Sequence, residues 1–563
     1  MEYKSLVAEN LKIHIDLEED IIQNSIKIPP QSKMGDLTFP CFELSKLLGK
    51  SPSVIAAELC PKLNTEGFEK IEAIGPYINF FVDKVALCQN IIKKVLLEGD
   101  SYGTSNVGEG RVITIEYSSP NISKPFQVED LASTVIGNSL YKTYKSQGYT
   151  SIAINHLGDW GAEFGKLLSG FKRWGDEEAL STEPIKEMLR IYLKFYDETE
   201  KKPILEYEAI EYFKNLQEGR EEEVRLWNEF KHCGLTYFHK IYDILGVKFD
   251  SYAWESFYNE KRAVVIEEIH KKALLVTSND AEVVSLQEYN MPPFILKKAD
   301  AVSIHATGDL AAAKYRKENY NFVKSLYVAG RDQSLHFKQV FTTLKLMGNL
   351  WADNCVHVPF GAVKFADQKL SSKRGHVVFL EDFFNEAVSK TLDIINEKNP
   401  TLENKETAGK TIGIGAIVFS YLKNHRQGDV VFDFGEMLSF EGDTASYVQY
   451  TYARGRSILR SYEIIEEDMD FAKLNFKEEF QLIKLLSNFN ATALLTLDKY
   501  EPSMLAKYVL DVAKAFNKVY NNQSILSTGD ILFKNPRLKI IEATCQVIKN
   551  ALYLLGIDVV EKI

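Results

Sequence analysis

The sequence predicts a multidomain chain, in which an α/β domain with a parallel sheet stands between a small α+β domain and an all-α C-terminal domain. Three observations predict it. A strand, a loop, a helix and a second strand follow one another between residues 111 and 160. Alternating and helical segments mix in the first 107 residues, and apolar residues recur at helical spacing from about 431 onward. The length of 563 residues is enough for several domains.

The first 107 residues are expected to form the α+β domain. The stretch "MGDLTFPCFELSKLLGKSPSVIAAELCPKL" indicates one or two helices, the second beginning at Ser51-Pro-Ser. The stretch "FEKIEAIGPYINFFVD" alternates in the way that strands do. The Gly- and Ser-rich stretch "LEGDSYGTSNVGEGR" is then expected to be a linker.

Residues 108–370 are expected to form the α/β domain. "RVITIEYSS" predicts a strand, and "DLASTVIGNSLYKTYKSQG" predicts a helix that ends near Gly148. "YTSIAINHLGDWG" gives a second strand and a loop, so the two strands are expected to be parallel. Ligands of such sheets bind at the carboxyl ends of the strands. Glu116, Ser118 and the following loop are therefore placed at a site.

Further segments complete the expected order of elements. Residues from about 165 to 290 are mostly helical and charged, which indicates an insertion or an outer layer. "SLYVAGRDQSLHFKQVF" repeats the pattern of strand, loop and helix. Residues 431–563 are expected to be helical throughout. The last helix carries apolar residues at spacings of three and four and is stopped by Gly556.

The composition excludes several classes of protein. The chain is 45% hydrophobic and 26% charged, and its longest apolar runs are too short to span a bilayer. The N-terminus lacks the pattern of a signal peptide, and the six cysteines are far apart without a CxxC pair. We therefore expect a cytoplasmic protein with neither a metal site nor a disulfide framework. The net charge of −11 decides little, because a local basic face is enough to bind nucleic acid.

Two motifs point to phosphate chemistry, and each has a purely structural alternative. The turn "SSPNISKPFQVEDLASTVIG" leads into a helix, whose N-terminus offers free N–H groups to a phosphate. Its structural alternative is a plain turn with Asp130 as the N-cap. The basic motif "KLSSKRG" suits a loop that folds over a triphosphate, and its alternative is a solvated basic loop.

A scattered set of polar residues follows predicted strands and loops. Carboxylates that converge on one pocket favour a guanidinium ligand, because they bind it in bidentate geometry. The sequence alone leaves their convergence open, and "NHLGDWG" is equally consistent with a loop that packs Trp160. The set consists of Glu116, Ser118, Asn121, His156, Asp309 and Gln333.

Taken together, these stretches resemble the arginyl-tRNA synthetases, a family of class I aminoacyl-tRNA synthetases, along the whole chain. "MGDLTFP" and "GPYINFF" are similar to the family's N-terminal domain, which touches the tRNA elbow. "SSPNISKPF", "LASTVIG", "NHLGDWG", "GDLAAAKYR" and "QSLHFKQV" resemble its Rossmann-type catalytic domain. "KLSSKRGHVVFLED" resembles its KMSKS loop, so residues 371–430 are assigned to that loop and a stem-contact region. "FDFGEMLSFEGDTASYVQYTYAR" and "EPSMLAKYVLDVAKAFNKVYNN" resemble its all-α, DALR-type anticodon-binding domain, residues 431–563.

The resemblance implies a two-step reaction. Arginine attacks the α-phosphate of ATP, which is bound with Mg²⁺, and the arginyl group then passes to tRNA-Arg. The arginine ligands implied are Glu116, Ser118, Asn121, His156, His305, Asp309 and Gln333. The residues implied in ATP chemistry are Lys124, Gln127, Glu129, Asp130, Lys369, Ser371 and Ser372. The resemblance also implies a monomer that does not bind membranes.

The chain departs from the family's pattern at the start of the signature helix. The family's signature is HxGH followed by Leu-Arg, and here the positions hold Gln127, Val128, Glu129 and Asp130, with Ala132 for Arg. The glycine lets adenine lie against the backbone and the second histidine donates a hydrogen bond to ATP. A carboxylate about 4 Å from a phosphate charge repels it by roughly 4 kcal/mol at an effective dielectric of about 20, or two to three orders of magnitude in affinity.

Other departures lie in the arginine pocket and in adjoining segments. His305 replaces Tyr and Gly308 replaces Arg beside Asp309, while Glu163 replaces Gln and Ala445-Ser446 replaces Gly-Pro. Three hypotheses follow. The chain is an arginine–tRNA ligase with an unusual ATP site; or it is a divergent paralogue that binds tRNA or an arginine-like ligand; or it adenylates for another amino acid or acceptor.

Overall fold

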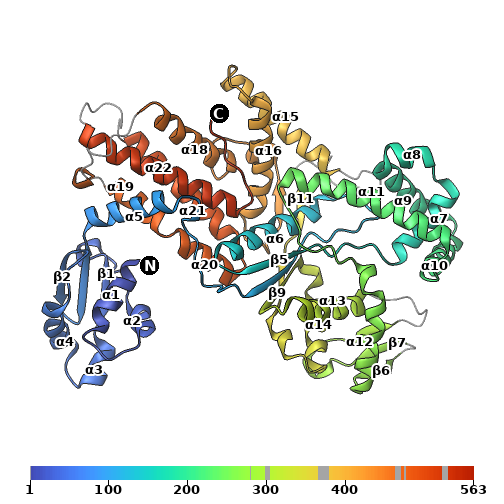
Figure 1. Cartoon of the computed structure of the whole chain (residues 1–563), viewed down its shortest axis with the longest axis horizontal. Coiled ribbons are helices and arrows are strands. Elements are labelled where there is room, and N and C mark those ends of the chain that lie inside the picture. Colours follow the sequence, from blue (N-terminus) through green and yellow to red (C-terminus); the bar gives the residue numbers. More distant parts are fainter. Residues whose placement is uncertain are drawn as a thin grey trace. The chain divides into compact units, whose positions relative to one another are not determined.

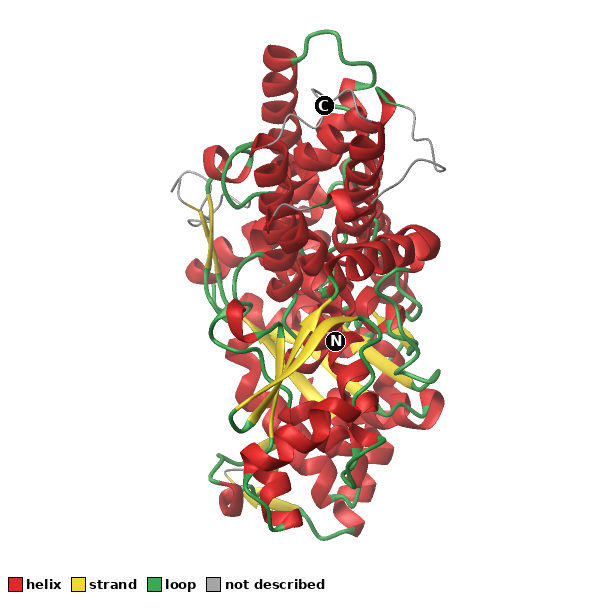
Figure 2. Ribbon diagram, turned by 90° about the vertical axis from the view of Figure 1, so that its left-hand side faces the viewer, coloured by secondary structure: helices red, strands yellow, loops and turns green. Residues whose placement is uncertain are grey.

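The protein is described from a computed structural model, which describes residues 2–278, 281–297, 305–365, 379–462, 471–474, 477–522 and 531–563. Contacts divide the chain into two compact units. One comprises Met1–Gly103, Arg454–Thr492 and Asp511–Asn550. The other comprises Thr104–Ala453, Ala493–Leu510 and Ala551–Ile563. Helices make up most of the described chain (Figure 2).

The first unit begins with the predicted α+β domain. An antiparallel sheet in the order β1-β3-β2 is combined with five helices (Figure 1). Ser51 caps α4 by accepting the N–H of Val54, with Pro52 at the first helical position, so the predicted helix start is confirmed. The elements are α1 Glu2–Lys12, α2 Glu19–Ser25, β1 Leu37–Pro40, α3 Phe42–Leu48, α4 Pro52–Leu59, β2 Phe68–Ile74, β3 Tyr77–Val82 and α5 Lys84–Glu98.

The second unit contains a four-stranded parallel sheet in the order β10-β9-β4-β5. Its strands are β4 Val112–Glu116, β5 Thr150–Ile154, β9 Lys324–Gly330 and β10 Cys355–Phe360. The two central strands are β4 and β9. The chain continues from β4 to the edge strand β5 on one side of the sheet, and from β9 to the edge strand β10 on the other side. The strand order therefore reverses between β4 and β9, which is where such sheets bind ligands. The predicted parallel pairing of the first two strands is confirmed.

Helix α6 Val128–Ser146 connects β4 to β5 and packs directly on the end of β4. A Cβ atom added at Gly137 would lie 2.2 Å from the Cβ of Tyr117, so only glycine permits this approach. The helix ends before Gly148, which has a φ of +80°, as predicted. Its buried face includes Leu131, Val135 and Leu140.

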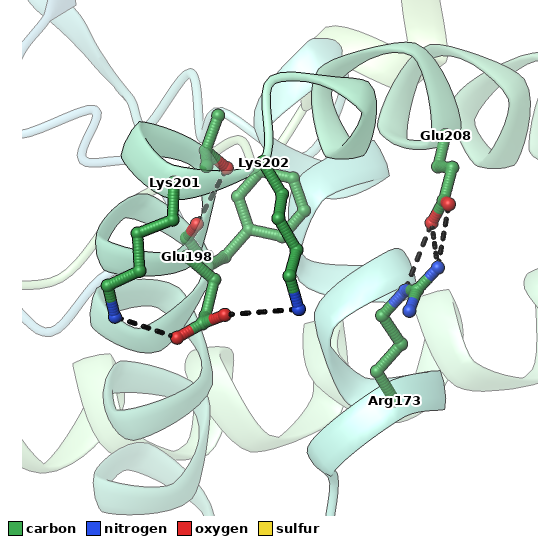
Figure 3. A network of polar contacts seen from close by, with 7 residues as sticks. Arg173, Glu198, Lys201, Lys202 and Glu208 are labelled. Atoms are coloured by element: carbon green, nitrogen blue, oxygen red, sulfur yellow. Dashed lines mark hydrogen bonds and ion pairs between the residues drawn. The ribbon is translucent and has the colours of Figure 1, made fainter.

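The insertion between β5 and β9 is helical in its first part and ends in strands. Its helices are α7 Ala162–Trp174, α8 Glu177–Thr182, α9 Pro184–Lys201, α10 Ile204–Gln217, α11 Glu221–Leu245 and α12 Asn259–Lys271. A small antiparallel sheet follows, β6 Leu275–Ser278, β7 Ala281–Val284 and β8 Phe294–Lys297, which the mostly helical prediction missed. Figure 3 shows the surface ion pairs Arg173–Glu208, at 2.5 Å, and Glu198–Lys201, at 2.9 Å. Exposed pairs of this kind contribute little to stability, so apolar packing holds these helices together.

The remaining segments are helical apart from one short strand pair. α13 His305–Tyr320 and α14 Ser334–Leu346 pack together, and β11 Val363–Phe365 pairs with β12 Val430–Phe432. The helices that follow β11 are α15 Leu380–Lys398, α16 Lys405–Leu422, α17 Phe434–Met437, α18 Ala445–Arg460, α19 Lys477–Ser487, α20 Phe489–Lys499, α21 Ser503–Asn522 and α22 Ile531–Leu554. Within the described ranges, no helix combines the length and the hydrophobicity that a membrane crossing requires.

Candidate functional site

A cavity of about 910 Å³ opens at the carboxyl ends of β4, β9 and β10. All six members of the scattered polar set line it, so the structure brings these distant residues together. Glu129 and Asp130 line the same cavity. Its charged and polar lining residues are Glu116, Ser118, Ser119, Asn121, Glu129, Asp130, Ser133, His156, Glu255, Asp309, Arg331, Asp332, Gln333 and His336.

The turn after β4 has an unusual backbone that hydrogen bonds hold in place. Ser118 and Ser119 have φ values of +66° and +50°, in the left-handed region that disfavours residues other than glycine. The Ser118 N–H donates to Ser133 Oγ at 3.0 Å, and the Ser119 N–H donates to Asn155 Oδ1 at 3.1 Å. Ser118 Oγ and the Tyr242 hydroxyl lie 2.9 Å apart. Backbone strain of this kind persists where the surroundings over-determine it, as they do here.

Two carboxylates at one end of the cavity already have side-chain partners within the protein. Glu116 forms an ion pair with Arg316, whose side chain is 1% exposed. Asp309 Oδ2 lies 2.6 Å from His336 Nε2. Glu116 is at the end of β4 and Asp309 is in the second turn of α13, so two separate elements bring these carboxylates to the same cavity.

The predicted residues His156, Asn121 and Gln333 lie on loops around the same cavity. The His156 N–H donates to Ser119 Oγ at 3.1 Å, and its Nδ1 lies 3.1 Å from the carbonyl oxygen of Ala253. Asn121 Oδ1 accepts the N–H of Ser123 at 2.9 Å, which leaves its amide nitrogen for other contacts. Gln333 ends the turn between β9 and α14. The cavity thus combines fixed carboxylates with amides on loops.

The start of α6 differs from its structural prediction. Gln127, and not Asp130, is the N-cap, because α6 begins at Val128, three residues before the first helical position that an N-cap at Asp130 implies. Asp130 is the third helical residue, and its Oδ2 accepts the backbone N–H of Gln127 at 2.8 Å, as in one half of a capping box. The Tyr421 hydroxyl donates to the carbonyl of Val128 at 2.5 Å and ties the same turn to α16.

Asp130 has a strongly perturbed acidity. Burial raises the pKa of its carboxyl, and the Gln127 N–H counteracts part of this effect, while Glu129 raises the pKa further; it reaches about 7. Asp130 is therefore partly protonated near neutral pH and is then a hydrogen-bond donor.

Several predicted site residues lie elsewhere or outside the described residues. Lys124 and Gln127 are not among the residues that line the cavity, and Lys124 Nζ lies 5.1 Å from the ring centre of Tyr192. His305 begins α13, but its side chain lies outside the described part of the structure. Lys369, Ser371 and Ser372 also lie outside the described residues.

Four titratable residues of the cavity were missed by the sequence reasoning. Three of them, Arg331, Asp332 and His336, lie in the segment after β9 that also holds the predicted residue Gln333, so their position close to Gln333 was the available signal. Glu255 lies in a short 3-10 helix within the insertion, and nothing in its local sequence distinguishes it. Six of the lining residues are acidic, whereas Arg331 is the one Lys or Arg among the described lining residues. The cavity therefore favours a cationic ligand.

Glu163, which replaces the usual Gln, lies on α7 among residues of the insertion. The Tyr196 hydroxyl donates to both of its oxygens at 3.1 Å, and Lys166 lies 3.3 Å away. Burial acts to raise the pKa of Glu163, but Lys166, the Tyr192 hydroxyl and Lys124 outweigh it and lower the pKa. Glu163 does not line the cavity, so this departure is a local packing feature.

Comparisons with known proteins agree with this architecture. Three sequence models match in order: "Arginyl tRNA synthetase N terminal domain" at residues 1–82, "tRNA synthetases class I (R), catalytic domain" at 91–434, and "DALR anticodon binding domain" at 448–563. The chain is 59% identical to an arginine–tRNA ligase of Clostridium perfringens and 57% identical to one of Clostridium kluyveri, over 100% of both chains in each case.

Solved structures show the same fold. Arginyl-tRNA synthetase from Thermus thermophilus matches with a TM-score of 0.80 at 22% identity, over 100% of this chain and 99% of that one. The Plasmodium falciparum enzyme matches with a TM-score of 0.77 at 23% identity, over 99% of each chain. The predicted fold class is confirmed. The order of domains, the parallel sheet with its cavity, and the full-length identity together show that the chain belongs to the class I arginyl-tRNA synthetase family.

Proposed function

We propose that the protein is an arginine–tRNA ligase, which activates arginine with ATP and transfers it to tRNA-Arg. One observation carries this proposal: the carboxylate and amide side chains implied as arginine ligands surround one acidic cavity at the point where the strand order reverses. A cavity with this charge suits a guanidinium ligand, because planar carboxylates bind it in bidentate geometry.

In the proposed complex, arginine occupies the end of the cavity that Asp309 and Glu116 line. Asp309 and Glu255 accept hydrogen bonds from the cationic groups of arginine, and Gln333 and Asn121 provide polar contacts. Glu116 Oε2 accepts a hydrogen bond from Arg316 Nη1, so Glu116 Oε1 is the oxygen that faces the substrate. His156 shapes the wall between these groups. His305 remains an implied ligand at the start of α13.

ATP is proposed to bind toward the start of α6, where helix N–H groups meet phosphate. Lys124 and the segment that contains Lys369, Ser371 and Ser372 are proposed to contact its phosphates, and Gln127 to Asp130 flank them. Mg²⁺ is proposed to arrive as part of the ATP substrate. Its preferred ligands are oxygens, which the phosphates provide.

The proposed chemistry has two steps. The carboxylate of arginine attacks the α-phosphorus of ATP, and the bond to pyrophosphate breaks. A hydroxyl of the terminal adenosine of tRNA then attacks the arginyl carbonyl, and AMP leaves with the bonding electrons. Donors at the start of α6 stabilise the charge that develops on the phosphates. We further propose that residues 1–107 contact tRNA and that residues 431–563 read the anticodon. Residues 108–370 are proposed to form the catalytic domain, and residues 371–430 the KMSKS-like loop and the stem-contact region. The protein is proposed to be a cytoplasmic monomer.

A second function is favoured by the carboxylates of Glu129 and Asp130 in the same cavity. They oppose a triphosphate, so a paralogue that binds arginine or tRNA without activating arginine is the alternative. A ligase for another amino acid or acceptor is the third. The assay that distinguishes these three functions is arginine-dependent exchange between ATP and pyrophosphate. It is to be measured with and without tRNA-Arg.

Exchange that depends on arginine, followed by charging of tRNA-Arg, supports the ligase. Binding of tRNA in a gel shift without any exchange identifies the paralogue and rejects the ligase. Exchange with an amino acid other than arginine identifies the third function. Pyrophosphate exchange without charging rejects tRNA-Arg as the acceptor.

A further inference from the structure

Arg262 is a buried guanidinium directly behind the arginine end of the cavity. It lies on α12, which packs against α13, and its side chain is 7% exposed. On α13 it faces Gly308, the residue before Asp309. A Cβ atom added at Gly308 would lie 3.0 Å from Arg262 Nη2, 3.3 Å from Nε and 3.4 Å from Cζ. The guanidinium therefore occupies the space in which any side chain at position 308 would begin.

The backbone itself does not require glycine at position 308. Gly308 lies inside α13, and its φ is not in the left-handed region. Glycine within a helix is less stable than alanine by roughly 0.5–1 kcal/mol. The feature that explains this glycine is therefore the guanidinium of Arg262, which contacts its Cα face.

Three carboxylates act electrostatically on the Arg262 guanidinium. Burial lowers the pKa of Arg262, and the charges of Glu255, Asp309 and Asp159 counteract this effect, so the side chain keeps its charge. Asp159 is fully buried and fixed, because it accepts the Ser256 N–H at 2.8 Å and lies 2.7 Å from Lys231 Nζ. The other two carboxylates line the cavity.

We propose that Arg262 is a positioning residue that sets arginine affinity by fixing the carboxylates of Asp309 and Glu255 from behind the cavity wall. The proposal rests on the proposed function, since these carboxylates are the arginine ligands. An arginine has five donors in a rigid fork and is suited to orienting two carboxylates at once. Asp309 Oδ2 also lies 2.6 Å from His336 Nε2, so Arg262 and His336 together determine which oxygen remains for the substrate.

The first test separates the arginine subsite from the rest of the enzyme. Arg262→Lys keeps the positive charge but loses the planar set of guanidinium donors, and Arg262→Met loses both. We expect the KM for arginine to rise about tenfold to a hundredfold in the Met variant, and less in the Lys variant. The KM for ATP at saturating arginine is expected to change by less than about twofold. Partial unfolding lowers the maximal rate but not KM, so a merely structural role does not produce this split.

The second test moves the guanidinium to the facing helix. Gly308→Arg alone places a second side chain in the occupied space and is expected to raise the KM for arginine. Combining it with Arg262→Met returns one guanidinium to the same position, so the double variant is expected to have a lower KM than either single variant. Lys271→Gln is the matched control, because it removes one positive charge from α12 at a side chain that is 71% exposed.

Arginine binding to each purified variant is measured by calorimetry beside the exchange kinetics. If the parent protein binds arginine and Arg262→Met binds it within about twofold of the parent, the positioning role is wrong. Additive effects in the double variant also overturn it. If the parent itself binds no arginine, the proposed function fails and this proposal fails with it. A selective rise in the KM for arginine, with recovery in the double variant, supports it.

Discussion

The acidity of Asp130 makes a testable prediction about ATP. Its carboxyl lies at the start of α6, lines the cavity and accepts the N–H of Gln127 through Oδ2. Burial, with Glu129 beside it, raises its pKa to about 7. Below this pH the group is mainly neutral and offers a proton to a phosphate oxygen; above it the group is a carboxylate that repels phosphate. ATP affinity is therefore expected to fall as the pH rises through 7.

The size of the effect follows from the titration. About nine tenths of the molecules carry the proton at pH 6 and about one tenth at pH 8. An ionised carboxylate about 4 Å from phosphate weakens binding by roughly two to three orders of magnitude, so the ionised form contributes little. Apparent affinity then follows the protonated fraction, and the KM for ATP is expected to rise about tenfold from pH 6 to pH 8.

The assay is pyrophosphate exchange at saturating arginine with tRNA present, measured at closely spaced pH values. Asp130→Asn is the matched variant, since its amide keeps an oxygen for the Gln127 N–H and a permanent donor for phosphate. Its KM for ATP is expected to remain flat over the same range, which also controls for the titration of ATP itself. A parent whose KM does not change with pH, or an Asn variant with the same slope, would refute this reasoning.

Three further outcomes are expected. Glu129→Gly with Asp130→His removes both carboxylates and should raise ATP affinity in the exchange assay; unchanged affinity means that these charges do not oppose ATP. Gly137→Ala should lower the free energy of unfolding by about 1–3 kcal/mol or more, because the added methyl collides with Tyr117, and a denaturation midpoint equal to the parent's would contradict this. Tyr421→Phe leaves a buried carbonyl at the start of α6 without its donor and should cost about 1–3 kcal/mol by the same measurement, whereas a neutral effect would mean that water replaces the hydroxyl.

Local sequence predicted β4 and β5, the end of α6, the start of α4 and the edge of the sheet at which the site lies. These features depend on short-range chemistry, such as the β-branched run of β4 and the glycine after α6. A sequence predicts that a segment is helical more reliably than it predicts the residue at which the helix begins. The structural alternative for this turn placed Asp130 at the N-cap, but Asp130 is the third helical residue, because Val128 and Glu129 are acceptable in a first helical turn.

The arrangement behind the cavity wall was not predictable in the same way. Arg262 and Arg316 lie in helices of ordinary composition, where a lone arginine is normally exposed. Their burial depends on which helix packs against which strand, and only the tertiary structure provides that information. Glu255 was missed for the same reason, since its place in the cavity lining depends on how its short 3-10 helix packs against α13.

The two ends of the cavity differ in how their acidic groups are compensated. At the arginine end, Arg316 pairs with Glu116, and Arg262 lies behind Asp309, so the protein itself balances these charges. At the start of α6, no Lys or Arg of the described residues forms an ion pair with Glu129.

The acidic residues at the start of α6 nevertheless suit the fold. Carboxylates in the first turn of a helix are stabilised by its dipole, and Asp130 also completes part of the cap. Because the fold raises the pKa of Asp130, its ionised form is disfavoured there, and the free energy of unfolding is expected to fall as the pH rises toward 7. It follows that arginine should bind this protein without ATP and with little dependence on pH, whereas ATP binding should be the step that pH controls. Arginine titrations at pH 6 and pH 8 that differ as much as the ATP titrations would show that the two ends are not independent.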